Sequence, residues 1–443
     1  MTTCHELSVG EEMYRWATDL FPLNRSLTGA GNRATLAYLR QILPGLSIHE
    51  VPSGTSAFDW TVPDEWNVTD AYVMDEIGRK VIDWKRNNLH LVGYSVPFQG
   101  SVSLEELQTH LHSLPNDPDA IPYVTSYYRG NWGFCISDQD RKALSDGIYR
   151  VVIDTILAPG SLTYGELLLP GEEKQEILLS TYICHPSMAN NELSGPVVTA
   201  ALARWLQSLP ARRFTYRIVF TPETIGAIVY LSRNLPIMKE RTIAGFVVTC
   251  VGDDRCYSFM PSRRGQSLAD RVARHVLKHS APDYKAYTFL ERGSDERQYC
   301  SPGVDLPVAS IMRSKYNKFP EYHTSKDNMT IISPSGLQGA HDILKTCLEV
   351  LEHNYVYKAT YLCEPQMSRR GLYPTLSRNN AEAWVRKMMN ILAYADGTGD
   401  LITLADEIGT SAKSCIDYVG QLLEAGLIGK VDGPAMAAGQ GAK

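Results

Sequence analysis

The side chains best suited to chemistry gather in residues 180–195. An apolar run ends there in His185, which is followed by Asn191 and Glu192. The run is typical of a strand, and the amphipathic pattern of residues 195–209 predicts a helix. A histidine that leaves a strand beside amide and acid side chains is well placed to bind a metal ion. The alternative is an ordinary surface loop between a strand and a helix.

Glu223 directly follows a β-branched, aromatic run at residues 216–221. A carboxylate at the end of a buried strand is well placed to act as a general base. The alternative is an acid that stabilises the start of the next predicted helix, residues 225–233.

Two further candidate residues lie next to predicted strands or helices. Asp253 comes just after the apolar run at residues 243–251, and His323 precedes the helix predicted at 333–352. Both residue types ligate metal ions, although acids at such positions are also common in turns. A polar loop between these motifs contains side chains that could bind substrate, namely Asp295, Glu296 and Arg297.

These motifs need a scaffold that brings distant loops together. Between residues 145 and 360, strand-like runs alternate with helical patterns, which predicts a doubly wound, mainly parallel α/β sheet covered on both faces. The C-terminal ends of strands in such sheets form the active-site edge. We assign residues 1–52 and 145–360 to this catalytic domain.

Two other segments differ from the predicted catalytic domain in residue composition and periodicity. Residues 53–144 are rich in aromatic residues and short β-type runs, which predicts a small inserted β-rich domain. Residues 365–443 are helical, and the predicted pair at 401–408 and 411–425 is joined by a Gly-bearing turn, as in a winged helix. From residue 378 onward this domain carries six basic and eight acidic residues, whereas a DNA-reading domain needs a basic face.

Composition narrows the function classes. The 443-residue chain has a formal net charge of −6, so we expect no nucleic acid partner. It has no apolar run long enough to span a bilayer and no signal-peptide pattern, so we expect no membrane partner. Nine scattered cysteines without a C-x-x-C pair indicate reduced thiols and a cytoplasmic protein. The sequence leaves the formation of a homo-oligomer open.

Taken in order, the motifs resemble those of the zinc aminopeptidase clan, di-zinc exopeptidases with a doubly wound sheet. The clan's metal ligands, general base and polar loop have counterparts in this chain at His185, Asn191 to Gly195, Glu223 with Thr224, Asp253, Ser294 with Asp295, and His323. Over nearly its whole length the chain resembles a bacterial family with an aminopeptidase-like domain, an inserted β module and a C-terminal winged helix, described alongside polysaccharide or antibiotic biosynthesis. The segments that resemble this family specifically are residues 24–29, 59–63 and 184–187.

Two departures from the clan change the expected metal content. Asn191 stands where the clan has a metal-bridging Asp, and Thr224 stands where it has a second Glu. A neutral amide cannot offset the charge of two Zn²⁺ ions as a carboxylate does. The resemblance therefore implies one Zn²⁺, with two as the alternative. Its ligands would be His185, Asp253 and His323, with Asn191 at the bridging position.

The resemblance implies a zinc-dependent amide or peptide hydrolase that acts on a small peptide or aminoacyl substrate. Its role would be dipeptide cleavage or a step in polysaccharide or natural-product biosynthesis. Glu223 would take a proton from water and pass it to the leaving amine. Asp295 or Glu296 would recognise the substrate's α-amine, and Glu192 would contact substrate or replace the missing bridging carboxylate. Because of the two departures, the alternative is a catalytically decayed, peptidase-fold binding protein.

Overall fold

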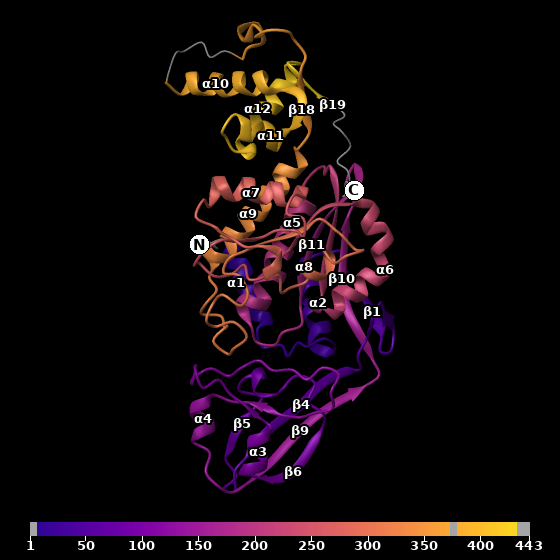
Figure 1. Ribbon diagram of the computed structural model, residues 1–443, viewed down its shortest axis with the longest axis vertical. Coiled ribbons are helices and arrows are strands. Elements are labelled where there is room, and N and C mark those ends of the chain that lie inside the picture. Colours follow the sequence, from indigo (N-terminus) through magenta and orange to yellow (C-terminus); the bar gives the residue numbers. More distant parts are fainter. Residues whose placement is uncertain (1–6, 373–378, 432–443) are drawn as a thin grey trace, which may run out of the picture.

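The computed structural model describes residues 7–372 and 379–431, which form three parts in a row. In Figure 1 an α/β core lies between a β-rich part at one end and a smaller helical part at the other. The chain leaves the core for the β-rich part, returns to complete the core, and then enters the helical part.

An eight-stranded sheet forms the centre of the core, in the order β1-β10-β12-β11-β13-β16-β14-β15. Its strands are β1 (Ser47–Pro52), β10 (Ser161–Leu169), β11 (Glu173–Tyr182), β12 (Phe214–Thr221), β13 (Thr242–Val247), β14 (Ser258–Met260), β15 (Lys285–Ala286) and β16 (Val308–Met312). The central strands β12, β11, β13 and β16 pair in parallel, and antiparallel pairs join them to β10 and β14. The predicted mainly parallel α/β sheet is confirmed.

Helices cover both faces of this sheet. One face carries α1 (Val9–Leu20), α2 (Ala30–Ile42), α5 (Ser194–Ser208), α7 (Leu268–Ser280) and α9 (Pro334–Glu352), and the other carries α6 (Ile225–Arg241) and α8 (Glu296–Tyr299). Ile177 and Leu179 of β11 pack towards the first set, and Leu178 packs towards the second. All three are fully buried, as expected for a central strand with both faces covered. Among the described residues, no helix combines the length and apolar character needed to cross a membrane.

The β-rich insert is built on an antiparallel sheet in the order β5-β4-β9-β6. Its elements are β2 (Ser56–Ala57), β3 (Trp60–Thr61), β4 (Glu65–Met74), β5 (Lys80–Asp83), η1 (Asn88–His90), β6 (Phe98–Ser103), α3 (Leu104–Thr109), β7 (Leu111–His112), β8 (Phe134–Cys135), α4 (Asp138–Lys142) and β9 (Ile148–Ala158). Because β9 pairs with both β4 and β6, the insert extends to residue 158 and not to the expected 144. The β-strand pattern of β9 does not encode which sheet it joins.

The C-terminal part contains η4 (Met367–Arg370), α10 (Asn379–Tyr394), α11 (Leu401–Glu407), α12 (Ala412–Glu424), and a sheet of β17 (Val356–Ala359), β18 (Asp396–Asp400) and β19 (Ile428–Val431). This arrangement is the predicted winged helix. Since β17 precedes the helices and pairs with both other strands, the domain begins near residue 355 and not at 365. The end of the predicted domain, residues 432–443, lies outside the described residues.

The N-terminus of α12 packs on the core. Ala412 donates its N–H to Nε2 of His275 on α7 at 2.7 Å, and Nδ1 of His275 lies 3.0 Å from Asp406. Lys413 also pairs with Glu349 of α9 at 2.9 Å. In DNA-binding helix-turn-helix proteins, the N-terminal residues of this helix read base edges in the major groove. Here the core covers that end.

Replacing His275 with Ala is expected to loosen the docked domain, because the buried Ala412 N–H loses its acceptor at a cost of about 1–3 kcal/mol. Hydrogen exchange over residues 401–424 should accelerate, while exchange in β11 stays slow. The control is Lys285→Ala, an exposed residue of the core strand β15 that should leave exchange unchanged. Equal exchange in the wild type and in His275→Ala would contradict this role for the hydrogen bond.

An ion pair between Arg33 of α2 and Glu65 of β4 ties the insert to the core. The two side chains make paired hydrogen bonds, of which Nη1 to Oε2 is 2.9 Å. Asn67 also donates to Glu65 at 2.9 Å, and its Oδ1 accepts the Ala30 N–H at 2.8 Å. The hydrogen bonds from Arg33 lower the pKa of Glu65 to about 2.

Glu65 should make the fold sensitive to acid. The pKa of Glu65 lies below the ordinary value of 4.5. Its contribution to the free energy of unfolding is therefore fully present above pH 4.5 and is lost as the pH falls from 4.5 towards 2. A Glu65→Gln variant should have a lower Tm at pH 7 and a shallower loss of Tm over this acid interval. Glu105→Gln, on an exposed position of α3, should follow the wild type. The expectation fails if the Glu65→Gln and wild-type curves are parallel throughout.

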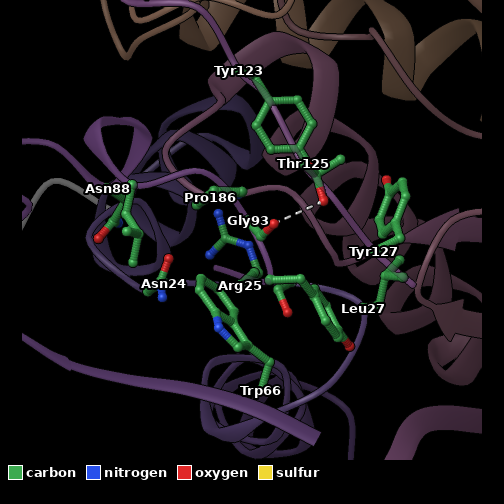
Figure 2. Close-up of a pocket in the computed structure, with 13 residues that line it drawn as sticks. Asn24, Arg25, Leu27, Trp66, Asn88, Gly93, Tyr123, Thr125, Tyr127 and Pro186 are labelled. Carbon is green, nitrogen blue, oxygen red and sulfur yellow. Dashed lines mark hydrogen bonds between the residues drawn. The ribbon is translucent and has the colours of Figure 1, made fainter. Parts of the chain in front are cut away.

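A small pocket lies where the insert meets the core (Figure 2). Its lining residues come from the loop before α2, from the insert and from the loop after β11, and they include Arg25, Trp66, Tyr94, Tyr123, Tyr127 and Pro186. Beside it, Tyr123 donates its N–H to the carbonyl of His323 at 2.9 Å, and Pro122 forms a β-bridge with Thr324. The insert therefore supplies one wall of the region that holds His323.

Candidate active site

One buried carboxylate holds the loop that carries His185. Asp327 accepts three backbone N–H groups, from Ala189, Asn190 and Asn191. These residues form the turn η2 (Ala189–Leu193), which leads into α5. At Gly195 an added Cβ would lie 2.4 Å from the Val248 carbonyl oxygen, so only glycine fits. The loop is thus fixed at the C-terminal ends of β11 and β13.

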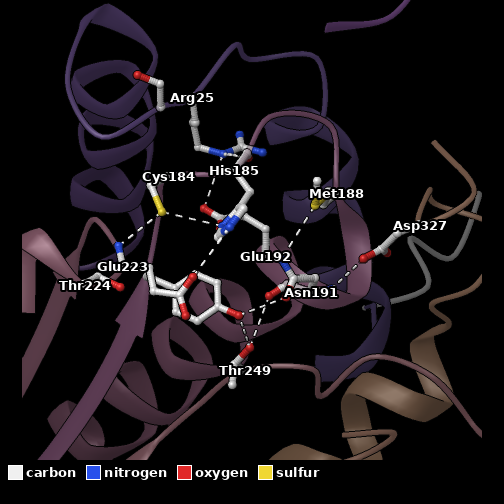
Figure 3. Close-up of polar contacts among 12 residues, drawn as sticks. Arg25, Cys184, His185, Met188, Asn191, Glu192, Glu223, Thr224, Thr249 and Asp327 are labelled. Carbon is white, nitrogen blue, oxygen red and sulfur yellow. Dashed lines mark hydrogen bonds and ion pairs between the residues drawn. The ribbon is translucent and has the colours of Figure 1, made fainter. Parts of the chain in front are cut away.

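His185 lies between two carboxylates, one at each ring nitrogen (Figure 3). Its Nδ1 is 2.8 Å from Glu192 Oε2, and its Nε2 is 3.5 Å from Glu223 Oε2. Burial, followed by the charge of Arg25, lowers the pKa of His185 to about 3, so the ring is neutral. A carboxylate that fixes one imidazole nitrogen leaves the other to face a ligand, as in many metal-binding histidines.

Arg25 belongs to this site, although no sequence pattern singled out its role. It is fully buried in the loop before α2. Its Nε donates to the His185 carbonyl at 3.1 Å and lies 3.6 Å from Glu192 Oε1. Burial raises the pKa of Glu192, and the charge of Arg25 opposes that rise. Glu192, which we expected to contact substrate or bridge metals, is therefore placed between Arg25 and His185.

His323 faces His185 across a gap bordered by aromatic rings. The two imidazole centroids are 5.3 Å apart, and the Tyr123 ring contacts both at 5.2 Å. Nε2 of His323 is buried without a hydrogen-bond partner. The residue has a φ of +56°, a conformation that is uncommon outside glycine and that clusters at functional sites. Burial, followed by the neighbouring His185, lowers its pKa to about 3.

Asn191 lies close to His185 but is engaged by a tyrosine. Its Oδ1 accepts from the Tyr182 hydroxyl at 3.1 Å, and that hydroxyl is 2.5 Å from Thr249 Oγ1. The Tyr182 ring lies 5.4 Å from the His185 ring. Thr249 in turn donates to the Asn191 carbonyl at 3.1 Å. Just beyond the end of β13, Asn191 thus meets a threonine and not an acid.

Asp253 is held by other partners. Its oxygens accept from Asn190 Nδ2, from the Arg255 N–H, and from the N–H and hydroxyl of Ser314, at 2.8–3.0 Å. No ion pair within the described part of the chain joins Asp253 to a histidine of the site. Four donors saturate the carboxylate, so these contacts do not support the expected metal ligation. The physical reason is that β13 ends at Val247, six residues before Asp253.

Glu223 is linked to the predicted substrate loop, which follows η3 (Phe289–Glu291), through its neighbour Thr224. Thr224 donates its N–H to Asp295 Oδ1 at 2.8 Å, and Arg297 donates to the Thr224 hydroxyl at 2.6 Å. Burial, followed by the charge of Asp295, raises the pKa of Glu223. Burial also raises the pKa of Asp295 to about 7. The structure therefore brings Glu223, Asp295 and Arg297 together.

The same loop holds several acceptor atoms without partners. Oε1 of Glu296 accepts from the N–H groups of Gly293 and Ser294 and from the Tyr316 hydroxyl. Its Oε2, like Asp295 Oδ2, is buried and unpaired within the described structure. Buried oxygen atoms of this kind are costly unless a donor meets them. A cationic group of a ligand would supply such a donor.

Two imidazole nitrogens of the site are available to a metal ion. Nε2 of His185 lies 3.5 Å from Glu223 Oε2, and Nε2 of His323, whose ring centroid is 5.3 Å from that of His185, has no hydrogen-bond partner. A second ion would need carboxylates at the positions of Asn191 and Thr224, where the chain has an amide and a hydroxyl.

A different trio has its ligand atoms within 4.8 Å of one another, namely Cys184, His185 and Glu192. In that set His185 would have to use Nδ1, which Glu192 already engages. Burial raises the pKa of Cys184 and so keeps it in the thiol form, which is a poor metal ligand. We therefore prefer the pair His185 and His323.

The chain is similar to proteins of known sequence and structure. Residues 14–354 match a family described as a domain of unknown function, DUF4910, and residues 355–430 match a winged helix-turn-helix family. A Clostridium acetobutylicum protein is 44% identical over 90% of this chain and 92% of its own length. It carries the provisional name of a polysaccharide biosynthesis protein with an aminopeptidase-like domain.

Solved structures show the same fold. A crystal structure of a provisionally named peptidase from Clostridium acetobutylicum has a TM-score of 0.90 and 41% identity, covering 95% of this chain and 96% of its own. A zinc aminopeptidase from Bacillus subtilis has a TM-score of 0.55 and 15% identity, covering 78% and 95%. The core thus has the aminopeptidase fold, and the chain belongs to the DUF4910 family of proteins with an aminopeptidase-like domain and a C-terminal winged helix.

Proposed function

We propose that this protein is a zinc-dependent hydrolase of amide or peptide bonds, with one zinc ion in place of two. The observation that carries the proposal is the grouping of His323 and Glu223 around the buried His185, which follows the C-terminal end of β11. His185 and His323 would hold the ion through Nε2, and Asn191 remains the proposed third ligand. When bound, zinc polarises a carbonyl and lowers the pKa of a bound water.

The chain's own residues would then handle the protons and the substrate. Glu223 accepts a proton from water and returns it to the leaving amine. Its raised pKa favours accepting that proton, which it then delivers to the nitrogen as the C–N bond breaks. Glu192 holds Nδ1 of His185, and Arg25 holds Glu192, so the imidazole cannot turn away from the reacting atoms.

The proposed substrate is a small peptide or aminoacyl compound with a free amine. The unpaired oxygens of Asp295 and Glu296 are suited to an ammonium group. The name of the Clostridium relative supports a place in polysaccharide biosynthesis. The eight described cysteines are free, which supports a cytoplasmic location.

Metal analysis combined with a substrate panel tests this proposal. We expect about one zinc per chain and hydrolysis of some aminoacyl amides, both abolished by a chelator and restored by zinc. Absence of zinc and of hydrolysis across the panel would favour the second candidate, a non-catalytic binding protein. That candidate is favoured by the amide at Asn191 and the hydroxyl at Thr224.

We also propose that the winged helix is a packing element without a nucleic acid partner. The docked N-terminus of α12 supports this role. A gel shift with random duplex DNA at low salt should show no complex.

A further inference from the structure

The insert exposes a group of aromatic side chains near the pocket of Figure 2. Trp60, Tyr127 and Tyr128 are 40%, 40% and 54% exposed, and we call them the aromatic shelf. The rings of Trp60 and Tyr128 lie 6.3 Å apart, and the Tyr128 hydroxyl donates to the Thr61 carbonyl at 2.8 Å. Phe58, at the tip of the β2–β3 hairpin and two residues before Trp60, is 61% exposed. Exposed aromatic groups of this kind mark binding sites.

Strained backbone holds part of this group in place. Tyr127 has a φ of +47° and Phe58 a φ of +55°, which bulky residues rarely adopt. Such conformations cost about 1–3 kcal/mol each and persist where the surroundings, often at a ligand site, enforce them. The strain therefore fixes two large rings at the surface, where neither gains the stabilisation of a buried core position.

The shelf is continuous with the candidate active site. Tyr127 and Tyr123 line the same pocket, and Tyr123 contacts the rings of both His185 and His323. The pocket encloses a cavity of about 10 Å³, which suits a single water-sized group.

Arg25 also lines this pocket, and Figure 2 shows its guanidinium in the midst of the lining residues. The side chain is fully buried, yet its Nη2 has no hydrogen-bond partner. An arginine nitrogen can only donate a hydrogen bond, so a ligand in this pocket would have to supply an acceptor oxygen atom.

We propose that the aromatic shelf and Arg25 form a subsite for a pyranose ring, so that the substrate is an aminoacylated or N-acylated amino sugar. This proposal rests on the proposed hydrolase function and names its substrate class. The C–H face of a pyranose packs on aromatic faces, whose π-electrons attract its partly positive hydrogens. A hydroxyl oxygen on the sugar ring accepts a hydrogen bond from Arg25 Nη2. The shelf presents two rings tilted by 54°, with the hydroxyl of Tyr128 beside them, a combination of aromatic and polar groups that suits a sugar better than an aliphatic side chain.

Binding measurements test the subsite without any need for turnover. Calorimetry would compare methyl N-acetylglucosaminide with N-acetyl-leucinamide on the full-length protein. We expect the sugar to bind more tightly, and to bind about three- to tenfold more weakly to Trp60→Ala and to Tyr127→Gly. Glycine suits the positive φ at position 127, so this variant removes the ring without unfolding the segment. The control is Ile77→Ala, an 87% exposed residue in the turn between β4 and β5.

The outcomes separate the subsite from the hydrolase proposal. Glu223→Gln should bind the sugar as the wild type does. Normal sugar binding by a wild-type protein that hydrolyses no aminoacyl amide would refute only the proposed function. Preferred binding of N-acetyl-leucinamide, or equal sugar affinity in the wild type and in Tyr127→Gly, would overturn the subsite. Absence of sugar binding to the wild type at millimolar concentration would overturn it as well.

Discussion

Under the proposed mechanism, a Glu223→Gln variant is expected to lose about 10²- to 10⁴-fold in kcat and to bind as much zinc as the wild type. The amide has nearly the shape of the carboxylate but cannot accept a proton from water. Glu223 lies 3.5 Å from His185 Nε2, and an amide of nearly the same shape can occupy the same position. The change should therefore leave His185 and His323 in place. Steady-state kinetics on an aminoacyl amide from the substrate panel, together with elemental analysis, measure the two effects.

The matched control for this variant is Glu321→Gln. Glu321 is a partly exposed acid that pairs with Arg255 on the surface, and its loss should leave kcat unchanged. Full turnover in Glu223→Gln would remove this residue from the mechanism. Loss of zinc together with turnover would show that Glu223 is a metal ligand and not a base.

Replacing Arg25 with Met should destabilise the protein by about 3–5 kcal/mol, because the buried Glu192 then has no cationic partner. Both side chains are fully buried, so water cannot screen the loss. The double variant Arg25→Met with Glu192→Gln should regain part of this stability, since it removes the unpaired charge. Thermal or urea unfolding of the wild type, the two single variants and the double variant, arranged as a double-mutant cycle, gives the coupling between the two side chains.

Arg255→Met is the comparison for a surface pair. Its partner is Glu321, its side chain is 45% exposed, and such pairs contribute about 0–1 kcal/mol. If the double variant at Arg25 and Glu192 is as unstable as Arg25→Met alone, the ion pair is not the cause. Arg25 would then act through its hydrogen bonds to the carbonyls of Leu20 and His185.

The sequence predicted the elements that follow from local periodicity. β11 and β12 each contain a buried, mostly apolar run, and a helical pattern follows each strand, so the parallel sheet and its functional edge could be inferred. His185 and Glu223 could be placed because each closely follows such a strand, whereas His323 could be placed by its position as the last of the polar motifs in order.

The parts that could not be predicted depend on contacts between distant segments. Arg25 lies 160 residues from His185 in the chain. The polar, Gly-bearing loop sequence around Arg25 does not indicate a role beside that histidine. The position of Asp253 depends on where β13 ends, which differs from the end of its apolar run. The sheet that β9 joins depends on pairing with β4 and β6, which no pattern within β9 encodes.

The connection between β9 and β10 is only two residues long, Pro159 and Gly160. One strand belongs to the insert and the other to the central sheet, so this link leaves little length for a hinge. The insert is also held by the Arg33–Glu65 pair and by the bridge between Pro122 and Thr324. The opening to the site is therefore set when the protein folds. A ligand would be selected by how well it fits a preformed entrance, and its arrival and departure would not wait for a domain to close.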